Sequence, residues 1–152
     1  MTEQTKGHTK AVRQCVLMLE TIEIYLSYSN SDIYAIFSGL SKKNSYSNLL
    51  FIDKVYNNLK NGVDFDDAYV KSLNNPQTTK FLDKNDIDLL KGFYSVLGQS
   101  DVDGQISNCR LYKQFFNQKL NTLESQEKSK CKSNIALSIG SGLIISIIFL
   151  KV

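Results

Sequence analysis

Residues 102–123 read VDGQISNCRLYKQFFNQKLNTL. Apolar side chains recur there at intervals of three and four residues, which places them on one face of an α-helix. The stretch therefore predicts a long helix whose apolar face packs against a core. Ser100 and Asp103 are expected to form a capping box at its start. The residues of the apolar stripe are Val102, Ile106, Cys109, Tyr112, Phe116, Leu120 and Leu123.

The residues upstream show the same helical period and no strand-like alternation of useful length. Ser31 and Asp64 are expected to cap two of these helices, and Gly62 is expected to end another. The sequence therefore predicts an all-α fold, a compact bundle of about six helices. The five upstream helices cover about residues 6–28, 32–40, 47–60, 65–73 and 83–97.

The composition suits one ordinary domain and argues against nucleic-acid binding. The chain has 152 residues, 42% of them hydrophobic, and a formal net charge of +3. This charge is too balanced to indicate a nucleic-acid partner. Moreover, only Arg13 and Arg110 supply guanidinium groups, the usual phosphate ligands.

Few residues are suited to catalysis or metal binding. The cysteines Cys15, Cys109 and Cys131 form no C-x-x-C pair, so we expect free thiols in a reducing compartment. His8 lies in a polar N-terminal stretch, and we expect it to be solvated. The sequence contains no phosphate-loop, G-x-S-x-G or H-E-x-x-H motif. It therefore predicts no metal, no cofactor and no enzymatic activity.

The C-terminus holds a long apolar segment. Residues 133–150 carry no charge and as a helix would span about 27 Å, close to the ~30 Å hydrocarbon core of a bilayer. Lysines are more numerous before this segment than after it, so the positive-inside rule places the rest of the chain in the cytoplasm. The expected organisation is a cytoplasmic bundle over residues 1–123, a polar helical stalk over 124–132 and a transmembrane helix over 133–150.

Small residues recur every four positions within this apolar segment, at Ser138, Gly142 and Ser146. Such spacing lets a second helix approach closely in lipid. Glycine and serine are also common in membrane spans in general. Two interpretations of this spacing therefore remain open. One is a packing site for a membrane partner, and the other is the ordinary composition of a membrane span.

Acidic residues are concentrated in the middle of the chain, where residues 61–103 contain eight acidic and four basic side chains. One interpretation is a face that docks a partner. The other is helix capping and solubility, because carboxylates are favoured at helix N-termini. The residues concerned are Asp64, Asp66, Asp67, Asp83, Asp86 and Asp88.

Residues 89–114, LLKGFYSVLGQSDVDGQISNCRLYKQ, resemble stage III sporulation protein AB, in which a helix ending in Leu-Gly-x-Ser-Asp is followed by a glutamine. The first helix and the C-terminal apolar segment are similar to that family too, so the resemblance covers nearly the whole chain. The stretch 59–68 is also similar to the repeat of type II secretion inner-membrane platform proteins. The residues that carry these two motifs here are Leu97, Gly98, Ser100, Asp101 and Gln105, and Gly62, Phe65 and Ala68.

The first of these motifs has an architectural interpretation. Gly98 suits a left-handed helix end, and Asp101 suits the positive end of the next helix. Gln105 lies one turn later, where we expect it to bind the connecting backbone. The family usually begins with a hydrophobic helix, whereas this chain opens with MTEQTKGHTK. We therefore expect either a longer form or a member with one anchor.

The resemblance implies a non-enzymatic assembly component of the channel complex between mother cell and forespore, placed in the outer forespore membrane on the mother-cell side. It also implies a secretion-type ATPase, stage III sporulation protein AA, as a partner, together with other membrane proteins of the complex. A homo-oligomer is compatible with the same implication. The alternative is a tail-anchored helical adaptor or tether unrelated to sporulation.

Overall fold

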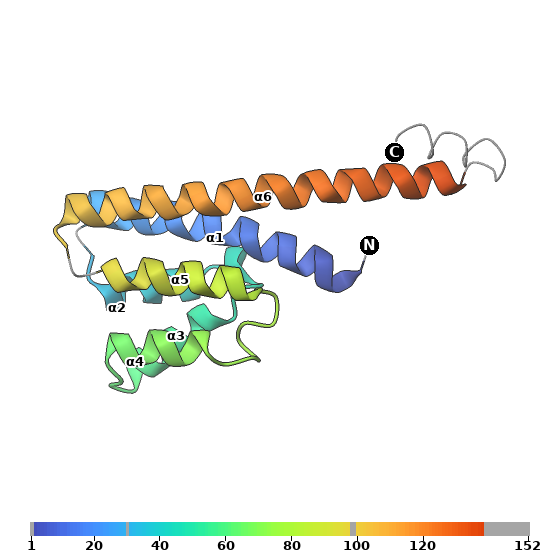
Figure 1. Ribbon diagram of the computed structural model, residues 1–152. Helices are drawn as coiled ribbons and strands as arrows, with labels where there is room; N and C mark the ends of the chain where they lie inside the picture. Colours follow the sequence, from blue (N-terminus) through green and yellow to red (C-terminus); the bar gives the residue numbers. More distant parts are fainter. Residues whose placement is uncertain (1, 30, 98–99, 139–152) are drawn as a thin grey trace.

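The computed structural model describes residues 2–29, 31–97 and 100–138 (Figure 1). These residues form six α-helices and one short 3-10 turn, and no strand occurs among them. The all-α prediction is therefore confirmed for this part of the chain. The elements are α1 (Glu3–Tyr28), α2 (Ile33–Ser41), η1 (Asn44–Tyr46), α3 (Phe51–Lys60), α4 (Phe65–Leu73), α5 (Lys84–Val96) and α6 (Val102–Ser138).

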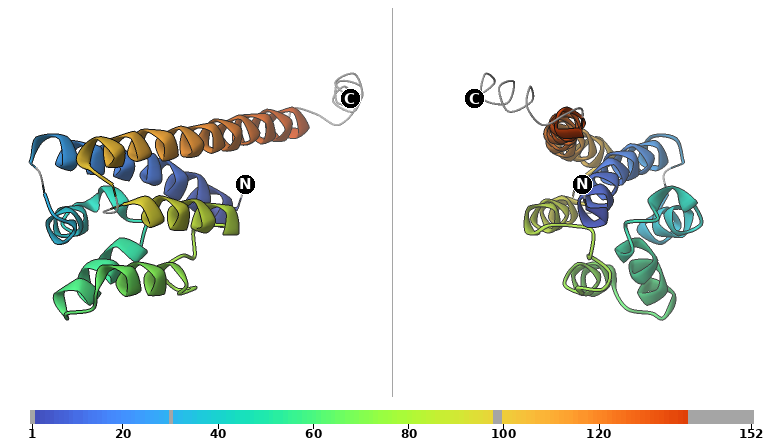
Figure 2. Two further views of the ribbon diagram at one scale, coloured as in Figure 1. Left: turned by 60° about the vertical axis from the view of Figure 1, so that its left-hand side comes forward. Right: turned by 90° about the vertical axis from the view of Figure 1, so that its right-hand side faces the viewer.

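The six helices close into a ring around the core. Each helix packs against the next along the chain, and α6 returns to pack against α1. The contact between α1 and α6 is the most extensive in the fold, and these two long helices run antiparallel side by side (Figures 1 and 2). The N-terminus of α1 and the C-terminal half of α6 consequently lie at the same end of the bundle.

The apolar faces of the first and last helices form much of the core. Val12, Cys15 and Leu19 of α1 are fully buried, and so is Phe116 of α6. Val102 departs from the prediction, because 39% of its surface is exposed at the start of α6. The ring closes around these side chains, so their burial supplies much of its stability.

Aromatic rings fill the other side of the core. Tyr69 of α4 stacks on Tyr94 of α5 with ring centroids 4.8 Å apart, and Phe65 packs against both rings. The Tyr69 hydroxyl donates a hydrogen bond to the Leu90 carbonyl at 2.8 Å. Burial raises the pKa of Tyr69, so this hydroxyl stays protonated. The ring cluster joins α4 to α5.

Two predicted helix starts differ from the structure. Asp32, and not Ser31, caps α2, because Asp32 is the last extended residue and its Oδ1 accepts a hydrogen bond from the Ala35 N–H at 2.8 Å. The third helix begins at Phe51 and not at residue 47. Its expected first turn is displaced by η1, where the buried Tyr46 hydroxyl lies 2.6 Å from the Thr21 hydroxyl.

The start of α6 also differs from the prediction. Asp101 Oδ1 accepts a hydrogen bond from the Gly104 N–H at 2.8 Å. Asp101 is therefore the capping residue, in place of the expected box of Ser100 and Asp103. The capping residue must stand directly before the first helical turn. Asp101 occupies this position, whereas Ser100 lies one residue too early.

α6 continues without interruption from the bundle through residues 124–132 to Ser138. No helix in the described part of the chain is both long and apolar enough to span a bilayer. Most of the transmembrane helix predicted over residues 133–150 lies outside the described residues. Gly142 and Ser146, two residues of the predicted small-residue stripe, lie outside them too.

Candidate functional site

A buried polar cluster joins α1, α5 and α6. His8 Nε2 of α1 lies 2.7 Å from Oδ2 of Asp86 on α5. The Asp86 side chain is completely buried, and the His8 side chain is only 18% exposed. The prediction of a solvated His8 is therefore wrong. It failed because the carboxylate that binds the imidazole is 78 positions away in the sequence.

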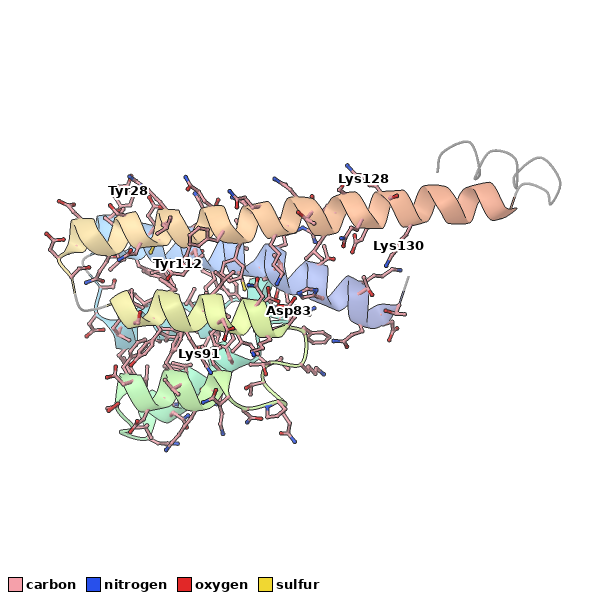
Figure 3. All side chains as sticks on the ribbon, in the orientation of Figure 1. Tyr28, Asp83, Lys91, Tyr112, Lys128 and Lys130 are labelled. Atoms are coloured by element: carbon pink, nitrogen blue, oxygen red, sulfur yellow. The ribbon has the colours of Figure 1, made fainter. Side chains whose placement is uncertain are left out.

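Lys119 of α6 completes this cluster. Its ammonium group pairs with Asp86 Oδ1 and donates to both carboxylate oxygens of Asp83, at 2.7 and 2.8 Å. Asp83 is the N-cap residue of α5 and forms a reciprocal capping box with Asp86. Figure 3 shows Asp83 at this end of α5. We call these four residues, His8, Asp83, Asp86 and Lys119, the three-helix cluster.

The cluster balances its charges within the fold. The hydrogen bond that His8 donates to Asp86 is the main cause that raises the pKa of His8 above its usual value. Desolvation opposes ionisation of Asp83, yet the bonds from Lys119 and from the Asp86 backbone lower the pKa of Asp83 overall. When His8 is protonated, the imidazolium and the Lys119 ammonium face two carboxylates. A network of charges paired across three helices fixes their relative positions.

The three-helix cluster also contains a potential ligand set for a metal ion. Ligand atoms of His8, Asp83 and Asp86 lie within 4.8 Å of one another. However, the Lys119 ammonium already contacts both carboxylates and supplies the positive charge that an ion would bring. The donor set therefore fits an internal ion-pair clamp better than a cation site.

A second set of ion pairs runs along the seam between α1 and α6. Arg13 pairs with Glu124 at 2.9 Å, and Arg110 pairs with Glu23 at 2.7 Å. Exposed pairs of this kind contribute little energy each. Their spacing along the two antiparallel helices nevertheless sets one register. The start of the predicted stalk thus packs against α1 instead of projecting freely.

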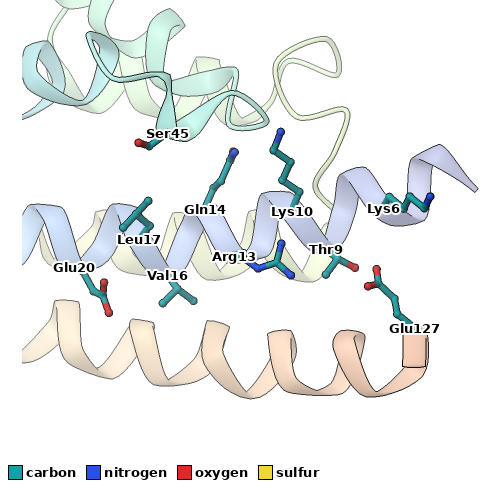
Figure 4. A pocket seen from close by; sticks show the side chains of 10 residues that line it. All are labelled: Lys6, Thr9, Lys10, Arg13, Gln14, Val16, Leu17, Glu20, Ser45 and Glu127. Atoms are coloured by element: carbon teal, nitrogen blue, oxygen red, sulfur yellow. The ribbon is translucent and has the colours of Figure 1, made fainter. Parts of the chain in front are cut away.

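A groove of about 810 Å³ opens along the outer surface of α1 (Figure 4). Its lining includes the apolar residues Val16 and Leu17, and the basic residues Lys6, Lys10 and Arg13 lie toward the N-terminus of α1. Ser45 borders it on one side and Glu127 of α6 on the other. Sequence reasoning missed this groove, because its walls come from three separate segments.

Comparison with known proteins identifies the family. A family model described as stage III sporulation protein AB matches residues 1–150. The chain belongs to this family. The membership implies a role in sporulation. A search of curated proteins and a search of solved structures gave no significant match.

The motif shared with the sporulation family lies at the turn between α5 and α6. Leu97 is buried, and Asp101 caps α6. Gln105 Nε2 donates to the Ser100 carbonyl at 2.8 Å, which is the bond to the connecting backbone expected for this glutamine. Gly98 lies outside the described residues. The described motif residues thus hold the turn between α5 and α6 together.

The second family motif spans the turn between α3 and α4. Gly62 has a φ of +84°, the left-handed conformation that ends α3. Asp64 then caps α4 with a 3.1 Å bond to the Asp67 N–H. Phe65 joins the aromatic cluster, and Ala68 is fully buried. The three motif residues therefore form a helical hairpin that closes on the core.

The six acidic residues predicted as a docking face separate into two groups. Asp86 is buried and Asp83 pairs with Lys119, so these two belong to the three-helix cluster and not to a docking face. Asp64, Asp66 and Asp67 remain exposed at the N-terminus of α4. Asp88 is exposed on α5. The N-terminus of α4 is thus the densest acidic surface of the original set.

Proposed function

We propose that this protein is a non-enzymatic, membrane-anchored component of the channel complex between mother cell and forespore. In this proposal it couples a secretion-type ATPase to the membrane. The sporulation family supports the setting. The proposal for a mechanical role rests on one observation, the uninterrupted 37-residue helix α6.

α6 is long enough to connect two distant points. At 1.5 Å per residue its 37 residues extend about 55 Å. Its first part is held in the bundle, and Lys128 and Lys130 lie on the part that extends past α5 (Figure 3). The last described residue of α6, Ser138, is already within the predicted transmembrane segment. A displacement of the bundle would therefore reach the anchor through one continuous helix.

The three-helix cluster makes the bundle end of this connection rigid. Lys119 lies about halfway along α6 and ties it to the N-terminus of α5, while His8 ties the same point to α1. Removing one partner from a buried charge network is costly, so sliding of α6 alone is disfavoured. The bundle and α6 are expected to move as one body.

A break in the exposed part of α6 tests the mechanical role. Ser129 is exposed on the part of α6 that follows the Arg13–Glu124 pair. Ser129→Pro interrupts the helix, whereas the matched Ser129→Ala preserves it. We expect Ser129→Pro to reduce heat-resistant spore counts at normal protein level, and Ser129→Ala to leave them unchanged. Normal sporulation of Ser129→Pro would refute the mechanical role.

The ATPase contact is proposed for Asp64, Asp66 and Asp67 at the exposed start of α4. Reversal of these three charges to lysine is expected to abolish pull-down of the ATPase. Reversal of Asp88, which is exposed elsewhere in the bundle, serves as the control. Unchanged ATPase binding after the triple reversal would show that the contact lies on another surface.

The proposed topology is tested through Cys131, which precedes the predicted anchor. Cys15 and Cys109 are buried, so they add little background to a labelling experiment in intact cells. A membrane-impermeant thiol reagent applied from outside is expected to leave Cys131 unlabelled. Labelling from outside would reverse the topology.

A further inference from the structure

One face of α1 is exposed along the whole helix. Seven residues on it follow one another at intervals of three and four, and each of them is exposed. In an α-helix such positions fall within an arc of about 80°. We call this face the α1 ridge. It consists of Lys6, Lys10, Arg13, Leu17, Glu20, Ile24 and Tyr28.

The C-terminal half of the α1 ridge is apolar. Leu17 is 40% exposed, Ile24 57% and Tyr28 86%. Single exposed apolar side chains are ordinary, but these three share one line on one helix. They do not belong to the core, which the opposite face of α1 supplies. The helix therefore has apolar side chains on two faces. Within the described residues the outer face forms ion pairs with α6 through Arg13 and Glu20, while Leu17, Ile24 and Tyr28 stay exposed.

The surface beside the α1 ridge is concave. The groove of about 810 Å³ runs past Leu17, with Ser45 on one side and Glu127 on the other (Figure 4). A second hollow of about 330 Å³ includes Ile24 and Tyr28, and Glu20 lines both. From Lys6 to Tyr28 the ridge extends about 33 Å, the length of a helix of about 22 residues.

One wall of the groove is held in place before any partner binds. The Gln14 amide oxygen accepts a hydrogen bond from the Asn48 N–H at 2.8 Å, and the Gln14 amide nitrogen lies 3.3 Å from the Ser47 hydroxyl. These bonds fix the segment that follows η1 against α1. A surface organised in this way loses less conformational entropy when it binds.

The charged residues of the α1 ridge are distributed unevenly along the helix. Arg13 pairs with Glu124, and Glu20 lies 3.7 Å from Lys113. Lys6 and Lys10 form no ion pair within the described part of the chain. The ridge thus presents two ammonium groups without an ion pair at its N-terminal end. From Leu17 onward it presents three apolar side chains, with the Glu20 carboxylate between Leu17 and Ile24.

We infer that the α1 ridge binds an amphipathic α-helix of a partner protein. Carboxylates of that helix lie opposite Lys6 and Lys10, and its apolar side chains lie against Leu17, Ile24 and Tyr28. The inference goes beyond the proposed ATPase contact, which involves α4.

Two other occupants fit the ridge less well. A bilayer surface is flat, whereas the ridge borders concave hollows, and its lysines lie in line with the apolar residues and do not flank them. In an antiparallel pair of α1 ridges Lys6 and Lys10 would face Tyr28 and Ile24, and in a parallel pair lysine would face lysine. Neither arrangement neutralises the two ammonium groups.

Photo-crosslinking of the full-length chain in sporulating cells tests the inference. A benzophenone side chain replaces Ile24, and the crosslinked peptide is identified by mass spectrometry. The expected product is a segment of another protein with helical apolar spacing and acidic residues at one end. A crosslink to a second copy, to lipid or to a segment without acidic residues would overturn the inference, and so would the absence of any product.

Charge and apolar variants supply the second readout. Lys6→Glu with Lys10→Glu, and separately Leu17→Asp, are each expected to lower the crosslink yield at position 24 at least about tenfold, or 1.4 kcal/mol of binding. The matched control is Leu111→Asp with Phe115→Asp, which changes comparably exposed apolar residues on α6. An unchanged yield in the ridge variants, or an equal loss in the control, would overturn the inference. None of these variants changes Asp64, Asp66, Asp67 or Ser129. A negative result would therefore refute the ridge as a binding site without refuting the proposed function, which those residues test.

Discussion

His8 Nε2 and Asp86 Oδ2 lie 2.7 Å apart, although the two residues are separated by 78 positions in the chain. The pair joins the first helix to the start of α5, and Lys119 extends it to α6. Buried ionised groups are tolerated only when they are paired and hydrogen-bonded. The arrangement therefore fixes the relative positions of α1, α5 and α6. It also attaches the middle of α6 to the bundle at Lys119.

Removal of the Asp86 carboxylate is expected to destabilise the protein strongly. Asp86→Ala leaves Lys119 and His8 partly unpaired and breaks the capping box, so we expect a loss of about 3–5 kcal/mol in the free energy of unfolding. Asp88→Ala, on the same helix but exposed, is expected to change it by less than about 0.5 kcal/mol. Urea unfolding of the full chain in mild detergent measures both. Equal effects would show that the cluster does not hold the bundle.

Stability is expected to fall as the pH rises above about 6.5, the ordinary pKa of histidine. Folding raises the pKa of His8, chiefly through the hydrogen bond to Asp86. Protonated His8 therefore stabilises the fold fully below the unfolded pKa, and this contribution is lost as the pH passes the folded pKa.

The control for this pH dependence is His8→Gln, which does not titrate. The difference in unfolding free energy between wild type and His8→Gln is expected to shrink between pH 6 and pH 8. A constant difference over that range would contradict the assigned role of His8.

Gly62→Ala is expected to destabilise the hairpin between α3 and α4 by about 1 kcal/mol. Gly62 has a φ of +84°, and a Cβ built there meets no atom within 4 Å. The expected loss is therefore conformational and not steric. Gly62→Asn should cost less, because asparagine tolerates the left-handed region better. A larger loss for asparagine than for alanine in thermal unfolding would contradict this reason.

Cys15 and Cys109 are expected to resist alkylation in the folded protein. Both are buried, and burial raises the pKa of Cys109 to about 12. At pH 8 the thiolate fraction of Cys109 is then about a thousandfold below that of an ordinary thiol. In a Cys131→Ser variant, iodoacetamide should label neither cysteine until urea unfolds the chain. Rapid labelling without urea would show that the core opens readily.

Local patterns were sufficient to predict most of the helices. The stripe of α6, the cap at Asp64 and the left-handed Gly62 depend on residues within one or two turns, and all three agree with the structure except for Val102. The cap of α2 was misplaced by one residue, because neighbouring Ser31 and Asp32 both have side chains that suit a cap. Such a choice depends on backbone conformation that spacing does not reveal.

The candidate site depended on contacts that no local pattern contains. An isolated histidine in a polar stretch and an aspartate in the first turn of a helix each have an ordinary solvated interpretation. Only the packing of α1 and α6 against α5 brings His8 and Lys119 to Asp86. The same packing removed Asp83 and Asp86 from the acidic surface that composition alone had suggested.

The amino-acid sequence by itself determined the helical class, the boundaries of most helices and the family, because these depend on residue spacing and on short motifs. The tertiary structure alone decided which charges are buried and paired, and which face of α1 stays exposed between its hollows. The physical reason is distance along the chain. Helical period acts over three or four residues, whereas desolvation and ion pairing act between any groups that folding brings together.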